Sequence, residues 1–245
     1  MNKGVRYKLP LDRLSCFCLK FATKMFFKLS MGLAQLQEPE IPQQEGKKIY
    51  ALDKNHKGFN WNKLAFALSL PFNPCHTETM LEIPGFQYLN VDDVRRKVRG
   101  LVLDVDGTLL PPYSDGDFSP EVVEKLREVR DKMEVCVFSN RGQERNIFKE
   151  LGIPVVEDGP PKPHPEGFDR AARHYLKLEP QQCAMVGDNI LTDGGANRVG
   201  MEFILVDPIP GKERLLPRFA RGYGRLVKNT YDWLYREKIP KRIRD

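Results

Sequence analysis

Short apolar runs alternate with amphipathic stretches between residues 100 and 206, a pattern typical of strands that alternate with helices. The apolar runs predict strands over residues 100–105, 134–138, 153–156, 183–186 and 203–206. The amphipathic stretches predict helices that begin after Ser119 and that cover residues 143–151, 166–176 and 190–198. Ser119 followed by Pro120 is a typical helix start, and Gly152 a typical helix stop. Because the connections are short, the pattern predicts an α/β fold, with a parallel sheet of about five strands and helices on both faces.

The two ends of the chain differ from this region in charge. Residues 1–37 carry seven Lys or Arg against one acid, which gives a formal charge of +6, and residues 212–245 carry eleven against four, which gives +7. The middle of the chain, residues 38–211, carries −7. A negative centre with two positive ends favours an anionic partner, either a membrane surface or a nucleic acid.

Residues 14–29 have the periodicity of an amphipathic helix, and lysines interrupt its apolar runs well short of the roughly 18 residues that a membrane span needs. We interpret residues 1–37 as a basic amphipathic segment that targets an organelle or lies on a membrane surface, or alternatively as an ordinary helix packed on the domain. The polar residues 38–58 predict a linker, and residues 59–99 predict a helical lead-in. The tail, residues 212–245, is basic and aromatic, and suits either a membrane-facing tail or a structural helix packed on the sheet.

The sequence VLDVDGTL, residues 102–109, places Asp104 and Asp106 at the end of the first predicted strand. Two carboxylates this close together repel each other unless a cation lies between them or a proton neutralises one of them. An Asp-Gly pair is also common in turns, so this motif alone does not distinguish a turn from a ligand site.

Three further polar residues fall at the same edge of the predicted sheet. Ser139 and Asp188 each follow a strand, and Lys162 lies in the loop after another strand. Each has a simpler explanation by itself, a helix cap for Ser139 and Asp188 and a solvated charge for Lys162. Ligands bind outside the carboxyl ends of the strands in such sheets, so the convergence of these residues with Asp104 predicts a phosphate-handling site.

Together these stretches resemble the haloacid dehalogenase superfamily of phosphohydrolases over residues 100–207. DVDGT resembles the first motif of that superfamily, the strand that ends at Ser139 the second, Lys162 with Pro163 the third, and GDNILTD the fourth. KPHPEGFDRA and AMVGDNILTD are most similar to one group, the bacterial, plastid and mitochondrial phosphatases related to phosphatidylglycerophosphate phosphatase. The resemblance implies a Rossmann-like phosphatase domain over residues 100–211. It also implies an enzyme of cardiolipin and phosphatidylglycerol synthesis that converts phosphatidylglycerophosphate to phosphatidylglycerol.

The resemblance also implies a role for each site residue. Asp104 would attack phosphorus as the nucleophile, and Asp106 would transfer protons. Mg2+ would be bound by the carboxylates of Asp104 and Asp188 and by the backbone carbonyl of Asp106. Asp193 would orient Lys162 or a metal-bound water. The residues that would bind the phosphoryl oxygens are Thr108, Ser139, Asn140 and Lys162.

Relatives that act on small metabolites insert a cap domain in one of two places, and this chain has room at neither. Eight residues separate Leu110 from Ser119, and 22 separate Ser139 from Lys162. We therefore expect no cap domain and an open site, suited to a phosphate on something large. A lipid in an anionic phospholipid membrane fits this expectation, and the basic ends would be attracted to its surface.

We accordingly expect a peripheral protein on the matrix side of the mitochondrial inner membrane, or alternatively in the plastid. We expect phosphatidylglycerophosphate as the substrate and no nucleic-acid partner, and the sequence leaves the oligomeric state open. The alternatives are a phosphatase for a soluble phosphomonoester or a nucleic-acid phosphate end, and a catalytically silent membrane scaffold.

Overall fold

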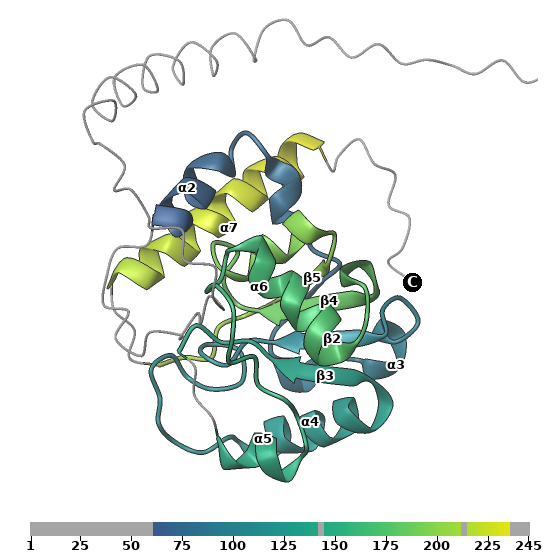
Figure 1. Cartoon of the computed structure of the whole chain (residues 1–245). Coiled ribbons are helices and arrows are strands. Elements are labelled where there is room, and N and C mark those ends of the chain that lie inside the picture. Colours follow the sequence, from purple (N-terminus) through teal and green to yellow (C-terminus); the bar gives the residue numbers. More distant parts are fainter. Residues whose placement is uncertain (1–60, 142–144, 212–214, 236–245) are drawn as a thin grey trace, which may run out of the picture. The chain divides into compact units, whose positions relative to one another are not determined.

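The computed structural model describes residues 61–141, 145–211 and 215–235 (Figure 1). The predicted amphipathic segment, residues 1–37, and the predicted linker, residues 38–58, lie outside the described residues. The described residues therefore include nearly all of the predicted phosphatase domain and of the lead-in, and most of the basic tail. Residues 143 and 144, the start of the predicted helix 143–151, lie outside them.

Five parallel strands form the central sheet, in the order β1-β5-β4-β2-β3. They are β1 (Leu81–Ile83), β2 (Gly100–Leu103), β3 (Glu134–Val137), β4 (Cys183–Gly187) and β5 (Glu202–Val206). The predicted α/β fold with a parallel, Rossmann-like sheet is confirmed. Between Leu110 and Lys162 the described residues contain two helices and one strand, as the short spacings predict, and no inserted cap domain.

One predicted strand is wrong, and another was missed. Residues 153–156 form only one isolated parallel bridge, between Val155 and Val137. To continue this pairing toward the amino end, the backbone N–H of residue 154 would have to donate the next hydrogen bond to β3. Pro154 has no N–H, so the pairing does not extend beyond the one bridge. The fifth strand is instead β1, which comes from the predicted helical lead-in and pairs with β5 at the other edge of the sheet.

Most of the predicted helices are present. The α-helices are α2 (Trp61–Ser69), α3 (Val91–Val94), α4 (Pro120–Lys132), α5 (Asn146–Glu150), α6 (Pro165–Arg170) and α7 (Leu215–Tyr235). The Ser119 hydroxyl accepts a hydrogen bond from the Val122 N–H (3.3 Å), which confirms the predicted start of α4. A π-helical turn, Ala171–Leu176, continues α6, and the helix predicted near residues 190–198 is a 3-10 segment, Asp193–Val199. The other short 3-10 segments are Pro74–Thr77, Phe86–Tyr88 and Pro180–Gln182.

Each face of the sheet has its own hydrophobic core, because successive strand residues point to opposite faces. Leu101 and Leu103 of β2 belong to the core beneath α3, α4 and α5. Val102 between them belongs to the core beneath α2, α6 and α7. Helices therefore cover both faces, and the carboxyl ends of the strands are left at one edge.

Helix α7 shows that the basic tail is largely structural. It lies beside α2 (Figure 1), and the Tyr223 hydroxyl donates a hydrogen bond to the backbone carbonyl of Ala67 in that helix (3.0 Å). Lys228 is buried and forms ion pairs with Glu82 of β1 and with Asp232. Of the two interpretations of the tail, the structural helix is confirmed for residues 215–235. Among the described residues, no helix combines the length and the apolar character that a membrane span requires.

We expect Tyr223→Ala to destabilise the protein, because it removes both the hydrogen bond to α2 and the packing of the ring against the core. The expected loss is about 2 kcal/mol of unfolding free energy, which lowers Tm by roughly 4–8 °C in a chain of this size. Trp233→Ala on the same helix is the matched control, since Trp233 is 68% exposed. Equal melting temperatures for the two variants would show that α7 does not depend on this contact.

Candidate active site

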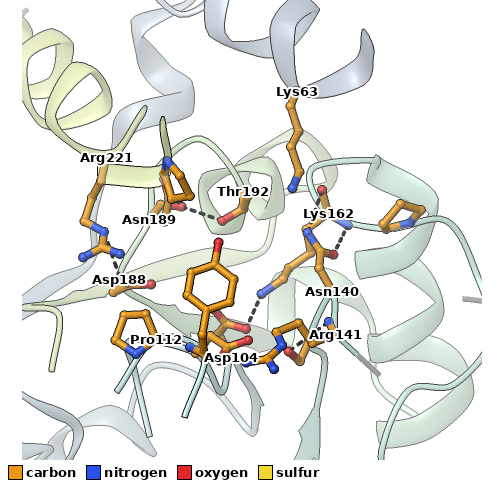
Figure 2. A pocket seen from close by; sticks show the side chains of 15 residues that line it. Lys63, Asp104, Pro112, Asn140, Arg141, Lys162, Asp188, Asn189, Thr192 and Arg221 are labelled. Atoms are coloured by element: carbon orange, nitrogen blue, oxygen red, sulfur yellow. Dashed lines mark hydrogen bonds and ion pairs between the residues drawn. The ribbon is translucent and has the colours of Figure 1, made fainter. Parts of the chain in front are cut away.

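Four of the predicted site residues meet at the carboxyl edge of the sheet. Asp104 directly follows β2, Asp188 directly follows β4, and Ser139 lies two residues beyond β3. They line one pocket of about 250 Å³ together with Lys162 (Figure 2). The remaining lining residues are Lys63, Asp106, Pro112, Tyr113, Asn140, Arg141, Pro161, Asn189, Thr192, Pro217 and Arg221.

Lys162 lies between two carboxylates at the base of this pocket. Its ammonium nitrogen is 2.7 Å from Asp104 Oδ1 and 2.6 Å from Asp193 Oδ1, and the residue is 1% exposed. Asn140 fixes the backbone of Lys162 from both sides, because its Oδ1 accepts from the Lys162 N–H (2.8 Å) and its Nδ2 donates to the Lys162 carbonyl (3.1 Å). The Asn140 side chain therefore holds the lysine loop in place, and one of its two amide N–H groups is used in doing so.

Burial and charge shift the pKa values of these groups in ways that the geometry explains. Burial raises the pKa of Asp104 to about 7; the Lys162 ammonium opposes this rise, and the carboxylates of Asp193 and Asp106 add to it. Burial lowers the pKa of Lys162, but its attraction to Asp104 and Asp193 outweighs that effect, so the net shift is upward. Lys162 is therefore a permanent cation, whereas the charge of Asp104 depends on how many positive charges lie beside it.

Asp104, Asp188 and Asp193 form a compact carboxylate cluster, with one oxygen from each lying within 4.8 Å of the others. Two glycines make this proximity possible. A Cβ on Gly107, whose φ is +85°, would collide with the Asp188 carboxylate, and a Cβ on Gly187 would collide with that of Asp193. Carboxylate oxygens are the ligands that Mg2+ takes in proteins, commonly one or two of them beside waters and substrate phosphate. The cluster therefore fits the predicted metal, with Asp104 and Asp188 as the carboxylates that Lys162 does not fully engage.

Asp106 and Thr108 lie in different surroundings. The Asp106 carboxylate accepts hydrogen bonds from Arg141 Nη1 (2.9 Å) and from the Tyr113 N–H (3.1 Å), and it lines the pocket. Thr108 is fully buried and does not line the pocket, so the structure does not bring its hydroxyl together with the other predicted phosphate ligands. Arg141 was not among the predicted residues, although its place directly after Ser139 and Asn140 could have indicated it.

Two more residues of the pocket come from outside the predicted phosphatase domain. Lys63 extends from α2 toward Lys162 and Asn140, and Arg221 extends from α7 toward Asp188 (Figure 2). Arg221 Nε lies 3.0 Å from Asp188 Oδ2, in an ion pair without hydrogen-bond alignment, and both side chains are largely buried. Helices α2 and α7 therefore contribute to the pocket, although all the predicted site residues lie within residues 100–211.

Comparisons with known proteins indicate a phosphatase family. The model of the HAD-hydrolase-like family matches residues 160–212. The chain is 33% identical over 136 residues to the probable phosphatase YqeG of Bacillus subtilis, covering 54% of this chain and 77% of that protein. It is 26% identical over 140 residues to the mitochondrial phosphatidylglycerophosphatase GEP4 of Saccharomyces cerevisiae, covering 51% of this chain and 75% of that protein.

Solved structures give a weaker likeness. A HAD-superfamily hydrolase from Geobacter sulfurreducens aligns with a TM-score of 0.33 at 15% identity, over 46% of this chain and 92% of that one.

We expect Lys162→Met to destabilise the fold strongly, because it leaves Asp104 and Asp193 buried without their shared cation. The expected cost in metal-free buffer at pH 8 is about 3–5 kcal/mol, measured by urea unfolding. Without the ammonium group, nothing from Lys162 opposes the rise that burial causes in the pKa of Asp104. Folded Asp104 then binds more protons than unfolded Asp104, so the stability of the variant rises as pH falls.

The difference in stability between the variant and the unmodified protein should therefore narrow between pH 8 and pH 5. Lys97→Met, at an exposed position on the amino side of β2, is the control and should change stability by less than about 0.5 kcal/mol. A pH-independent difference would argue against an electrostatic role for Lys162.

Proposed function

Because this chain belongs to the haloacid dehalogenase superfamily of phosphatases, we propose that it is a Mg2+-dependent phosphomonoesterase that forms an aspartyl-phosphate on Asp104. The observation that carries the proposal is the buried arrangement at the end of β2, where Asp104 contacts Lys162 and lies within 4.8 Å of Asp188. A carboxylate held beside a fixed ammonium and a second carboxylate suits nucleophilic attack on a phosphoryl group that a cation also holds.

The reaction then has two displacements. Asp104 forms a bond to phosphorus while the bond from phosphorus to the leaving oxygen breaks, and Asp106 donates its proton to that oxygen. Asp106 next takes a proton from water, the water oxygen attacks phosphorus, and the bond between phosphorus and Asp104 breaks. Arg141 keeps the Asp106 carboxyl beside the pocket through its hydrogen bond of 2.9 Å. Lys162 and the Ser139 hydroxyl stabilise the negative charge on the transferred group.

The metal would be held by Asp104 and Asp188, with the backbone carbonyl of Asp106 as a further ligand. When bound, Mg2+ offsets the charge of the phosphoryl oxygens and of the two carboxylates. Arg221 is the cation that faces Asp188 in the present structure, and it would then share that carboxylate with the metal.

For the substrate, we propose phosphatidylglycerophosphate on a bilayer surface, dephosphorylated to phosphatidylglycerol. The support is the resemblance of the third and fourth motifs to that group of phosphatases, and the likeness to the yeast phosphatidylglycerophosphatase. The name of that relative also supports a mitochondrial location for this chain. Within the mitochondrion, we propose attachment to the matrix side of the inner membrane. A plastid membrane is the alternative site.

An apolar stripe on α7 supports attachment to a membrane surface. It consists of Leu215, Phe219, Leu226 and Trp233, which are 71%, 73%, 64% and 68% exposed. Because they are spaced by four and seven residues, they lie along one side of the helix, opposite the side that packs on the core. The segment that contains this stripe, residues 212–245, carries a formal charge of +7, so an anionic bilayer complements it in both polarity and charge.

Asp104→Asn should abolish phosphate release from an aryl phosphate while leaving Tm unchanged within a few degrees, because an amide cannot attack phosphorus. Asp188→Asn should retain activity but require a higher Mg2+ concentration, since one carboxylate ligand is lost. Both are measured in one titration of phosphate release against Mg2+ after treatment with a chelator. Turnover by Asp104→Asn, or an unchanged metal titration for Asp188→Asn, would contradict the assignments.

The double variant Phe219→Ser/Trp233→Ser should bind anionic vesicles at least about tenfold more weakly, because two exposed aromatic side chains of the stripe are lost. Sedimentation with phosphatidylglycerol vesicles measures this. Hydrolysis of an aryl phosphate in solution should not change. Tyr88→Ser is the matched control, an exposed aromatic residue on the other face of the sheet, 63% exposed. If the double variant and the control bind alike, the stripe does not dock on membranes.

A further inference from the structure

Lys63 is a partly buried cation that the proposed reaction leaves unused. It lines the pocket from α2, and among the described residues it forms no hydrogen bond or ion pair. Burial lowers its pKa, and repulsion from Lys162 lowers it further, against weaker attraction from Asp193 and Asp104. An ammonium group that has lost part of its hydration beside another cation needs an anionic partner to make up the loss.

Arg221 approaches the same pocket from α7. Its Nε lies 3.0 Å from Asp188 Oδ2, and its side chain is 13% exposed. Figure 2 shows Arg221 and Lys63 reaching toward the pocket from two different helices, one on the side of Asp188 and the other on the side of Lys162. The two cations therefore lie at the rim, whereas Asp104 and Lys162 form the base.

The residues that line the pocket carry a net positive charge, and the pocket is larger than a few water molecules. Four cationic side chains line it, Lys63, Arg141, Lys162 and Arg221, against the three carboxylates of Asp104, Asp106 and Asp188. Its volume of about 250 Å³ compares with the ~30 Å³ that a water molecule takes up in the liquid. Lys162, Arg141 and Arg221 each lie beside a carboxylate of the site. Lys63 is the lining cation to which the described residues supply no such partner.

We propose that Lys63 and Arg221 form a second anion subsite, which binds a phosphodiester or other phosphate group attached a few atoms away from the phosphomonoester that is hydrolysed. The proposal rests on the proposed phosphatase function and specifies its substrate class, a molecule with two phosphate groups. The two helices would thereby perform the selection for which other members of the family use an inserted cap. Binding energy from the second phosphate would position the first one over Asp104.

A simpler alternative is that Lys63 binds the scissile phosphoryl group itself. The two possibilities differ in substrate dependence. A ligand of the scissile group affects all phosphomonoesters alike, whereas a second subsite affects only substrates that carry the second anion.

The test compares kcat/KM for glycerophosphoglycerophosphate, which carries a phosphodiester, with kcat/KM for glycerol 3-phosphate, which does not. Both compounds are water-soluble, so the comparison does not depend on membrane attachment. We expect the unmodified protein to prefer the first substrate. We expect Lys63→Met to reduce this preference about tenfold, which corresponds to the loss of one charge-assisted contact. Lys63→Arg should retain most of the preference, and Lys97→Met, which removes an exposed lysine on the amino side of β2, should retain all of it.

Each outcome decides one point. If Lys63→Met leaves the ratio of the two kcat/KM values unchanged, the subsite proposal is wrong. This includes the case in which both kcat/KM values fall by the same factor. If Asp104→Asn loses phosphate release but the ratio of kcat/KM values is the same in Lys63→Met as in the unmodified protein, the subsite proposal fails and the phosphatase function stands. If the unmodified protein hydrolyses neither these substrates nor an aryl phosphate in the presence of Mg2+, the proposed function fails and the subsite fails with it.

Discussion

A single ammonium group, that of Lys162, lies within 2.7 Å of two buried carboxylates, and the arrangement of the site depends on it. Such a buried contact contributes little net stability, because the cost of removing the charges from water offsets their attraction. Its effect is instead on charge and position. It keeps Asp193 and Asp104 close together, and it opposes the rise that burial causes in the pKa of Asp104. It contacts one oxygen of the Asp104 carboxylate, Oδ1. The Asn140 side chain fixes the lysine backbone, so the position of the ammonium group is set by β3 and its following loop.

The parallel sheet explains why charged residues that are far apart in the sequence lie close together in the structure. Adjacent strands β2 and β4 end at the same edge, and Asp104 and Asp188 follow them directly. Their close approach requires backbone without side chains, which is why Gly107 and Gly187 occupy positions where a Cβ would meet a carboxylate. Two constraints therefore act on the positions next to the strand ends. Some of these positions need a carboxylate for the site, and others need a glycine because a Cβ would collide with a carboxylate.

The same constraint decides what could be predicted from the sequence. Asp104, Ser139 and Asp188 were predictable because the register of a strand fixes where its last residue lies, and the apolar runs mark those strands clearly. Lys63 and Arg221 were not predictable, because helices joined to the domain by loops have no fixed register against the sheet. In addition, a lysine on an amphipathic helix gives the same sequence pattern whether it is solvated or points into a pocket. The two errors in the predicted strands have local causes. The predicted strand 153–156 is wrong because Pro154 cannot continue a ladder. Strand β1 was missed because its three residues are too short a run to distinguish from a helix.

Helix α7 contributes to the core, to the lining of the pocket and to the outer surface of the protein. One side of it packs on the core through Tyr223 and Val227, Arg221 reaches Asp188 from it, and the opposite side carries the apolar stripe. A bilayer bound to the stripe would therefore act on the helix that also positions a cation of the pocket. Binding of the bilayer to the stripe would change the pocket only if the bilayer bound one arrangement of α7 more tightly than another. The contacts of Lys228 with Glu82 and Asp232 hold the helix against the sheet, which limits such rearrangement and favours a rigid rim that a substrate meets already formed.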